Sequence, residues 1–158
     1  MKLRIIAVGR LKEDAEAVLV RRYAERLEPF ARAIGIGPLT ITEIAEARGE
    51  PALRKRAEGA EIMRLSGGIP IVALDEGGEA LTSEELAQWL RRLRDDGCAG
   101  LAFAIGGADG HAAEVIAAAR RSISLGRITL PHGLARAVLA EQLYRAATII
   151  AGHPYHRA

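Results

Sequence analysis

Apolar positions recur along the chain with two periods, and together they predict strands that alternate with helices. Residues 3–8 (LRIIAV) form an apolar run that ends at Gly9, which is typical of a strand. Residues 19–30 then place apolar side chains at helical spacing, with charged residues between them. These apolar positions are Leu19, Tyr23, Leu27 and Phe30. The chain therefore begins with a strand followed by a helix.

The next segment of the chain repeats this order. Residues 39–44 alternate apolar and polar side chains, as a half-buried strand does. Pro51 suits the first turn of a helix, because that turn has no use for its missing backbone N–H. An apolar stripe then predicts the buried face of this helix: Leu53, Ala57, Ala60 and Met63.

Residues 69–97 predict the clearest strand and helix. IPIVALD (69–75) is a continuous apolar run, as expected of a parallel strand that is covered on both faces. Thr82 and Glu85 have the spacing of a capping box, and Gly97 marks the end of the helix. The apolar positions between them are Leu86, Trp89, Leu90 and Leu93.

A fourth apolar strand, residues 99–105, leads into the segment GGADG and a helix around Val115 and Ile116, and a last helix is expected at about residues 134–150. This alternation predicts an α/β/α architecture with a largely parallel sheet, and the chain length favours one domain over residues 1–158. Ligands of such sheets bind beyond the carboxyl ends of the strands. Here those ends are Asp75, Gly106 and the segment just after Ser124.

The composition favours a globular protein in a reducing compartment. The chain is 49% hydrophobic and 27% charged, so no segment has the polar composition of a disordered one. No apolar run is long enough for a signal-peptide core or a membrane span, so we expect a cytoplasmic protein. Cys98 is the only cysteine and is expected to be a small buried side chain.

Positive charge is concentrated in the last third of the chain. Residues 111–158 carry six of the 22 Lys and Arg residues but only two of the 20 Asp and Glu residues. The same segment holds all four histidines: His111, His132, His153 and His156. Such a segment suits an anionic partner, whereas the spacing of the histidines predicts no metal site.

Short motifs taken alone leave several interpretations open. Gly106, Gly107 and Gly110 lack the G-x-G-x-x-G spacing of a dinucleotide fingerprint, so they suit either the close approach of a flat ligand or a tight turn. Ser122 and Ser124 lie outside any G-x-S-x-G elbow and are expected to be loop or capping hydroxyls.

Three further features have both a chemical and a structural interpretation. Asp75, at a strand end, could contact a ligand or cap the following loop. Glu141 and Arg145 are four residues apart on a helix, which is typical of a surface ion pair. The segment HPYHRA (153–158) offers stacking, hydrogen bonding and phosphate contacts, although a frayed end would also explain it.

Four stretches together resemble the ribosomal RNA large subunit methyltransferase H family of the SPOUT class: LDEGGEALTSEELA (74–87), FAIGGADG (103–110), SISLGRITLPHGLARAVLAEQLYRA (122–146) and HPYHR (153–157). The resemblance extends over the whole chain, including the KLRIIAVG start. It implies S-adenosylmethionine-dependent methylation of N3 of a pseudouridine in helix 69 of 23S ribosomal RNA, within the assembled ribosome. It also implies a trefoil knot near the carboxyl end and a homodimer whose active sites combine both subunits, with neither DNA nor a membrane as partner.

The same resemblance implies which residues form the site. The cofactor pocket would be lined by Leu74, Gly106, Leu125, Gly126, Arg127, Ile128, Thr129 and Leu130. The motif flanking this pocket is matched by His132, Arg136, Tyr144 and Arg145, and the terminal motif, which approaches the cofactor of the partner subunit, by Tyr155, His156 and Arg157. Four positions depart from the family pattern: Glu79, His111, Arg127 and Gly133.

The implied reaction needs no metal, because the protein must align donor and acceptor and help an imide nitrogen to lose its proton. We expect His156 to accept that proton and Arg157 to stabilise the developing anion, with Tyr155, His132 and Arg136 as further catalytic candidates. Two alternatives stay open. One is a non-catalytic, ribosome-associated RNA-binding module, and the other is a SPOUT enzyme that methylates transfer RNA or a ribose hydroxyl.

Overall fold

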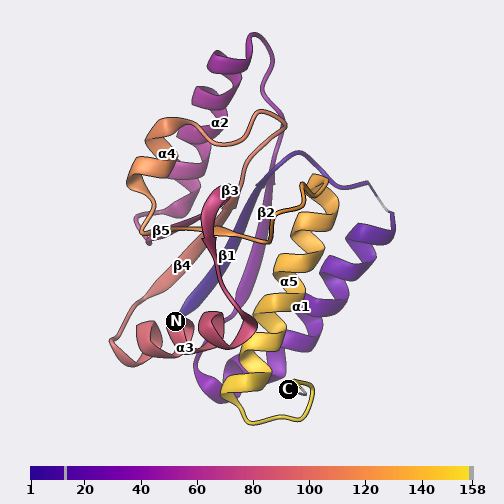
Figure 1. The fold of residues 1–158 in the computed structure, drawn as a ribbon, viewed down its shortest axis with the longest axis vertical. Coiled ribbons are helices and arrows are strands. Elements are labelled where there is room, and N and C mark those ends of the chain that lie inside the picture. The colour runs from indigo at the N-terminus through magenta and orange to yellow at the C-terminus, as the bar shows by residue number, and fades with distance from the viewer. Residues whose placement is uncertain (13, 157–158) are drawn as a thin grey trace.

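The computed structural model describes residues 1–12 and 14–156, which form strands and helices in strict alternation (Figure 1). The strands are β1 (Lys2–Val8), β2 (Leu39–Ile44), β3 (Ile71–Ala80), β4 (Gly100–Ile105) and β5 (Arg121–Ser124). The helices are α1 (Ala15–Ile34), α2 (Pro51–Ser66), α3 (Ser83–Asp95), α4 (Ala113–Ala118) and α5 (His132–Ile150). None of the helices described is long and apolar enough to cross a membrane.

The strands form one sheet in the order β2-β1-β4-β3-β5, and every neighbouring pair is parallel. At the centre of the sheet, Lys2 on β1 pairs with Gly100 on β4. Because all strands point the same way, their carboxyl ends meet at one edge of the sheet. The predicted parallel α/β sheet is therefore confirmed, and its ligand-binding edge is well defined.

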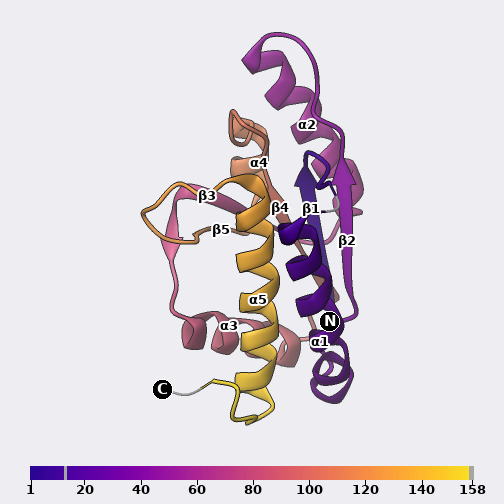
Figure 2. The same cartoon turned by 90° about the vertical axis from the view of Figure 1, so that its right-hand side faces the viewer.

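Helices cover both faces of the sheet (Figures 1 and 2). Helices α1, α3 and α5 enclose the larger core cluster, while α2 and α4 enclose the smaller one on the opposite face. On β1, Leu3 and Ile5 belong to the larger cluster, whereas Ile6 and Val8 belong to the smaller. Successive strand residues point to opposite faces, so a strand covered on both faces must be apolar throughout.

The capping box predicted before α3 is present. The Thr82 hydroxyl accepts a hydrogen bond from the Glu85 backbone N–H at 3.1 Å, and the Glu85 carboxylate accepts one from the Thr82 N–H at 2.7 Å. The predicted apolar positions behind it, Leu86, Leu90 and Leu93, are buried, and Trp89 packs partly against the same cluster. Two free N–H groups at the start of the helix are thereby satisfied.

The predicted buried face of α2 is wrong. Leu53 and Met63 are 62% and 40% exposed, and Ala57 and Ala60 are exposed as well. The face that is buried carries instead Glu58, Gly59, Ile62 and Ser66. Two close contacts explain why this face of α2 is the buried one. A Cβ at position 59 would lie 3.0 Å from Val115 on α4, and the Glu58 carboxylate accepts the backbone N–H of Ala47 at 2.9 Å.

The third strand also differs from the prediction, because β3 continues past Asp75 to Ala80 through an irregularity. Both Leu74 and Glu79 pair with Ile123 of β5, so residues 75–78 bulge out of the ladder. A Cβ at Gly78 would lie 2.6 Å from the backbone carbon of Ile123, so only glycine fits there.

Two smaller expectations also change. Helix α5 begins at His132, two residues earlier than predicted. Cys98 is half-buried instead of buried, and its thiol donates to the Gly100 carbonyl at a distance of 3.3 Å.

Candidate functional site

A cleft of about 810 Å³ opens at the carboxyl edge of the sheet. Three segments line it: residues 74–76 at the β3 bulge, residues 105–110 after β4, and residues 124–135 from the end of β5 to the first turn of α5. Within the last segment, residues 127, 133 and 134 do not line the cleft. This volume suits a cofactor-sized ligand. The cleft therefore lies where a parallel α/β sheet is expected to bind its ligand.

Most residues predicted to line a cofactor pocket come together in this cleft. They are Leu74, Gly106, Leu125, Gly126, Ile128, Thr129 and Leu130, and His132 lines it too. Arg127 does not line the cleft and is exposed. Ile128 is 81% exposed, so its side chain lies mostly in solvent at the rim.

The glycines after β4 build the floor of the cleft. A Cβ at Gly106 would lie 2.9 Å from the backbone carbon of Gly110, so the loop can fold back on itself only with glycine at that position. The Gly110 N–H donates to the Gly107 carbonyl at 3.0 Å. Asp109 in this loop accepts a 2.6 Å hydrogen bond from Arg54 on α2, which ties the loop to the neighbouring helix. GGADG is therefore a tight turn, and its residues line the cleft.

The loop between β5 and α5 forms the opposite wall. The Ser124 hydroxyl donates to the Gly126 carbonyl at 2.8 Å and accepts from the Gly126 N–H at 3.2 Å, as expected of a capping hydroxyl. The Thr129 hydroxyl donates to the Glu76 carboxylate at 2.9 Å, so this wall is linked across the cleft mouth to the β3 bulge. Ser122, in contrast, lies within β5 and not in a loop.

The cleft is lined both by acidic side chains and by a helix start that favours an anionic group. Asp75, Glu76 and Asp109 all line it, and Asp75 also accepts the Gly77 N–H at 2.9 Å, so it caps the bulge as well. The first turn of α5 borders the cleft, and no side chain caps its backbone N–H groups. Such a helix start attracts an anionic group.

His111 lies directly behind the glycine loop and is only 9% exposed. Neither ring nitrogen has a hydrogen-bond partner among the described residues. Burial lowers the pKa of this imidazole, and this effect outweighs the carbonyl of Ala104, the charge of Asp75 and the carbonyl of Leu74, which favour the protonated form. His111 is therefore a neutral core residue.

Arg136 was a catalytic candidate, yet it does not line the cleft and is only 1% exposed. Its guanidinium donates to the Glu43 carboxylate at 2.6 Å and to the carbonyls of Val8 and Gly9 at 2.8 and 2.7 Å. These groups lie at the carboxyl ends of β1 and β2, outside the cleft.

The carboxyl-terminal segment packs against its own chain. The Tyr155 ring lies 4.6 Å from the Tyr144 ring, and its hydroxyl donates to Glu141 at 3.1 Å. Arg145 pairs with the same carboxylate at 2.6 Å and stacks on the Tyr155 ring, so the predicted surface pair is part of a partly buried cluster. Burial, and then the bond to Glu141, raises the pKa of Tyr155 to about 12. Residues 153–156 are therefore packed against the rest of the chain and do not form a frayed end.

His156 forms a 2.6 Å contact with Glu84 on α3. Arg157, the other terminal candidate, lies outside the described residues. Helix α5 has 19 residues, so its two ends are about 28 Å apart at 1.5 Å per residue. The cleft borders the first end. The carboxyl-terminal segment follows the other end (Figure 1), and its Tyr155 contacts Tyr144 and Arg145 in the second half of the helix. One chain thus keeps its two groups of candidate residues apart.

Several residues of the site escaped sequence reasoning. Glu76, Asp109 and Arg54 hold the cleft loops. The Glu141–Arg145 pair was expected, but its contact with Tyr155 was not. The only trace of Asp109 in the sequence is its place inside GGADG, and the pairing of Arg54 with it joins residues 55 positions apart. No local pattern signals such a pair.

Comparison with known proteins gives a consistent relationship over the whole chain. The family described as "Predicted SPOUT methyltransferase" matches residues 1–156. A relative from Methylocella silvestris, named ribosomal RNA large subunit methyltransferase H, is 48% identical over 99% of both chains. A relative of the same name from Hyphomonas neptunium is 49% identical over 100% of both chains. The crystal structure of TrmJ from Z. mobilis is more distant, with 16% identity and a TM-score of 0.48 over 92% of this chain and 70% of that one. The chain belongs to the SPOUT methyltransferase family, and within it to the ribosomal RNA large subunit methyltransferase H group.

Proposed function

We propose that this protein is an S-adenosylmethionine-dependent methyltransferase that modifies a base of large-subunit ribosomal RNA. The observation that carries this proposal is the cleft that three segments form at the carboxyl edge of the sheet. The relatives of this chain are named ribosomal RNA large subunit methyltransferase H. The place of action would be the cytoplasm, where bacterial ribosomes are found.

The residues that line the cleft fit the chemical groups of this cofactor. Leu74, Leu125 and Leu130 offer an apolar surface for the adenine, and the glycine backbone offers hydrogen bonds without side-chain obstruction. Asp75 and Glu76 complement a sulfonium and an ammonium group, and the free N–H groups of α5 suit a carboxylate. The cofactor supplies an electrophilic methyl group when bound.

The target that we propose is N3 of a pseudouridine in helix 69 of the 23S ribosomal RNA, within the assembled ribosome. This nitrogen carries a proton that must leave before or during methylation. His156 is the proton acceptor in this proposal, and Arg157 stabilises the negative charge that develops on the base. His132 lies in the cleft wall and would face the base or the cofactor from the other side.

The catalytic unit that we propose is a homodimer. In one chain the carboxyl-terminal segment lies at the end of α5 remote from the cleft, so it cannot serve that cleft without a large rearrangement. A second copy, packed antiparallel along α5, would bring its own terminal segment to this cleft. Tyr155 then acts by holding the segment against α5.

A trefoil knot completes the proposed fold. Strand β5 lies at the edge of the sheet beside β3, and the β5–α5 loop then carries the chain back to pack α5 against α1 and α3 (Figure 2). Passage of this last segment through the β3–β4 region would tie the knot. Stretching the protein from both ends by single-molecule force would leave the chain shorter than its full contour length if the knot is present.

Cofactor titration by calorimetry tests the proposed function most directly. We expect the protein to bind S-adenosylmethionine without added metal, and Asp75→Asn to weaken binding by about threefold to tenfold, since a charge beside the ligand is lost. Asp96→Asn is the matched control, because Asp96 lies at the end of α3 and does not line the cleft. Absence of binding at millimolar cofactor would refute the proposal in favour of a non-catalytic RNA-binding module.

The RNA target is tested separately. Ribosomal RNA from cells with and without the gene is digested, and its modified bases are located by mass spectrometry. One methylated base of helix 69 should be lost without the gene. A change confined to transfer RNA or to a ribose would assign a different SPOUT activity.

A further inference from the structure

Arg136 is the largest fully buried side chain described in this protein. It lies in the first part of α5, and its guanidinium has three acceptors: the Glu43 carboxylate and the carbonyls of Val8 and Gly9. Glu43 also accepts the backbone N–H of Leu11 at 3.0 Å. One buried cation therefore joins α5 to the ends of β1 and β2 and, through Glu43, to the β1–α1 loop.

Close packing supports the same junction one turn earlier. A Cβ at Gly133 would lie 3.1 Å from Cγ of Glu16 and 3.3 Å from Cδ2 of Leu11, so the start of α5 presses directly on the β1–α1 segment. Helix α5 has no side-chain N-cap that could fix its start by itself. The position of its first turn thus depends on contacts with β1, β2 and α1.

This first turn is part of the cleft. His132 and Ala135 line it, and Ala135 directly precedes Arg136. The loop that forms the rest of this wall, from Ser124 onward, leads straight into the helix. Movement of the α5 start would therefore open or close the cleft without changing any residue that lines it.

We propose that Arg136 is a positioning residue that sets the affinity of the cleft for its cofactor by fixing the first turn of α5 to the ends of β1 and β2. The part of this inference that concerns affinity rests on the proposed function, whereas the fixing of the helix does not. Arg136 is buried and does not line the cleft, so the role that we assign to it is positioning and not catalysis.

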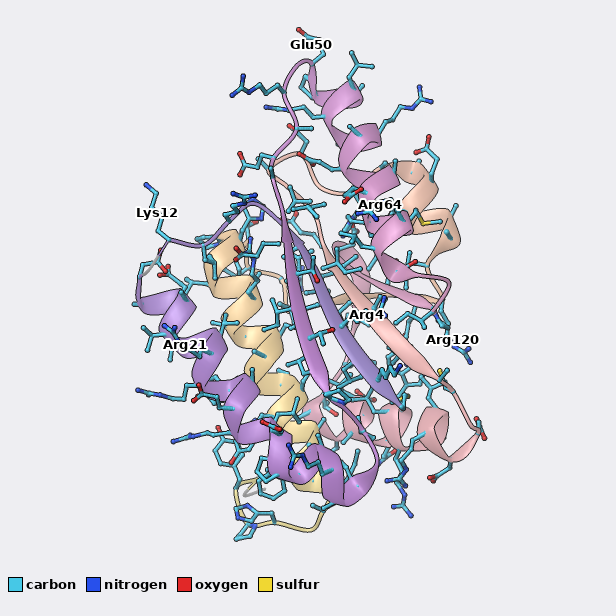
Figure 3. The ribbon with its side chains drawn as sticks, turned by 180° about the vertical axis from the view of Figure 1, so that it is seen from behind. Arg4, Lys12, Arg21, Glu50, Arg64 and Arg120 are labelled. Atoms are coloured by element: carbon cyan, nitrogen blue, oxygen red, sulfur yellow. The ribbon has the colours of Figure 1, made fainter. Side chains whose placement is uncertain are left out.

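The test compares Arg136→Met, Arg136→Lys and Glu43→Gln with Arg4→Met as the matched control. Arg4 is a second arginine that donates to backbone carbonyls, those of Leu65 and Ser66 at 2.8 and 3.2 Å, but it serves the end of α2 and does not line the cleft (Figure 3). Arg136→Met leaves three acceptors without their donor, whereas Arg136→Lys keeps the charge and can satisfy some of them.

The first readout is hydrogen exchange in the cofactor-free protein. We expect amides of residues 135–140 to exchange at least about tenfold faster in Arg136→Met, with an intermediate effect in Arg136→Lys and Glu43→Gln. Residues 143–150 at the other end of α5 should stay protected, as should the whole helix in Arg4→Met. Unchanged protection at residues 135–140 in all three variants would overturn the inference, whatever the protein binds.

The second readout is cofactor affinity and turnover. We expect Arg136→Met to raise Kd and KM for S-adenosylmethionine by about tenfold or more, Arg136→Lys to restore part of this loss, and kcat at saturating cofactor to stay within about threefold. Arg4→Met should lower Tm and leave Kd unchanged. A fall in kcat with unchanged Kd would make Arg136 part of the reaction, and a fall in Tm alone would make it a stabilising residue only. If Arg136→Met does not fold, Arg136→Lys and Glu43→Gln decide.

Discussion

His111 is a buried residue whose protonation opposes folding at acid pH. It lies behind the glycine loop with both ring nitrogens buried, and burial lowers its pKa below the ordinary 6.5. The folded protein therefore keeps this imidazole neutral over a range in which the unfolded chain already binds a proton. The stability that comes from keeping His111 neutral is fully present above about pH 6.5, and it is lost as the pH falls toward the lowered pKa.

Replacing His111 with leucine tests this directly. Between about pH 7.5 and about pH 5.5, the Tm of the wild-type protein should fall further than the Tm of His111→Leu. The variant has no imidazole at this position that could bind a proton on unfolding. The control is His153→Leu, since His153 is exposed. Parallel Tm profiles for wild type and His111→Leu would show that the ring is not the source of acid sensitivity.

Tyr155 gives the protein a second pH dependence of stability, at alkaline instead of acid pH. Its pKa is raised to about 12, first by burial and then by the bond to Glu141, so the folded state holds the phenol proton longer than the unfolded chain. The stabilisation is complete below the ordinary value of 10.0 and disappears as the pH rises toward 12. Phenolate absorbance of wild type minus Tyr155→Phe should show one group titrating near 12. A difference curve centred near 10 would contradict the contact with Glu141.

Among the elements, the order of strands and helices could be predicted because each has its own apolar period. The details that failed depend on contacts between elements. The buried face of α2 follows from Gly59 and Glu58, and the bulge in β3 follows from pairing with β5, neither of which has a local pattern. Helix α5 is apolar around most of its circumference, so its sequence could not show that Arg136 points away from the cleft.

For the candidate site, the sequence predicts the location of the cleft but not the contacts that hold its walls. The rule that ligands bind at the carboxyl ends of parallel strands located Asp75, Gly106 and the segment after Ser124 at one cleft. The links that hold its walls, Thr129 to Glu76 and Arg54 to Asp109, join residues more than 50 positions apart. Their partners become visible only when the chain is folded.

The β3 bulge yields a prediction for one element. Gly78→Ala should lower the free energy of unfolding by more than about 2 kcal/mol, because its Cβ would collide with backbone atoms of β5 that cannot move alone. Gly77→Ala is the adjacent control. Its Cβ would meet only a side-chain oxygen of Asp75 at 3.2 Å, so we expect a loss below about 1 kcal/mol. Urea unfolding measures both, and equal losses would argue against the bulge.

For the whole molecule, the separation of cleft and terminal segment along α5 makes a mixing experiment decisive. One variant carries Gly106→Val, which obstructs the cleft floor, and the other carries His156→Ala together with Arg157→Ala. Neither should methylate alone. Co-expressed in equal amounts, they should form mixed dimers in half of the cases, each with one intact site, and recover about a quarter of wild-type activity.

Folded variants are required for this comparison, and circular dichroism provides the check. Recovery would mean that the terminal segment of one subunit serves the cleft of the other. No recovery in a mixture shown to contain mixed dimers would mean that each chain uses its own segment.

The strand order also determines how quickly the chain can fold. Strands β1 and β2 are consecutive in sequence, and so are β3 and β4, so each pair closes a modest loop. The seam between the pairs joins Lys2 to Gly100, and closing so long a loop costs entropy before any contact offsets it. We therefore expect docking of the two halves to limit the folding rate. In stopped-flow refolding, Phe103→Leu at this seam should slow folding, whereas Val115→Ala on α4 should mainly accelerate unfolding.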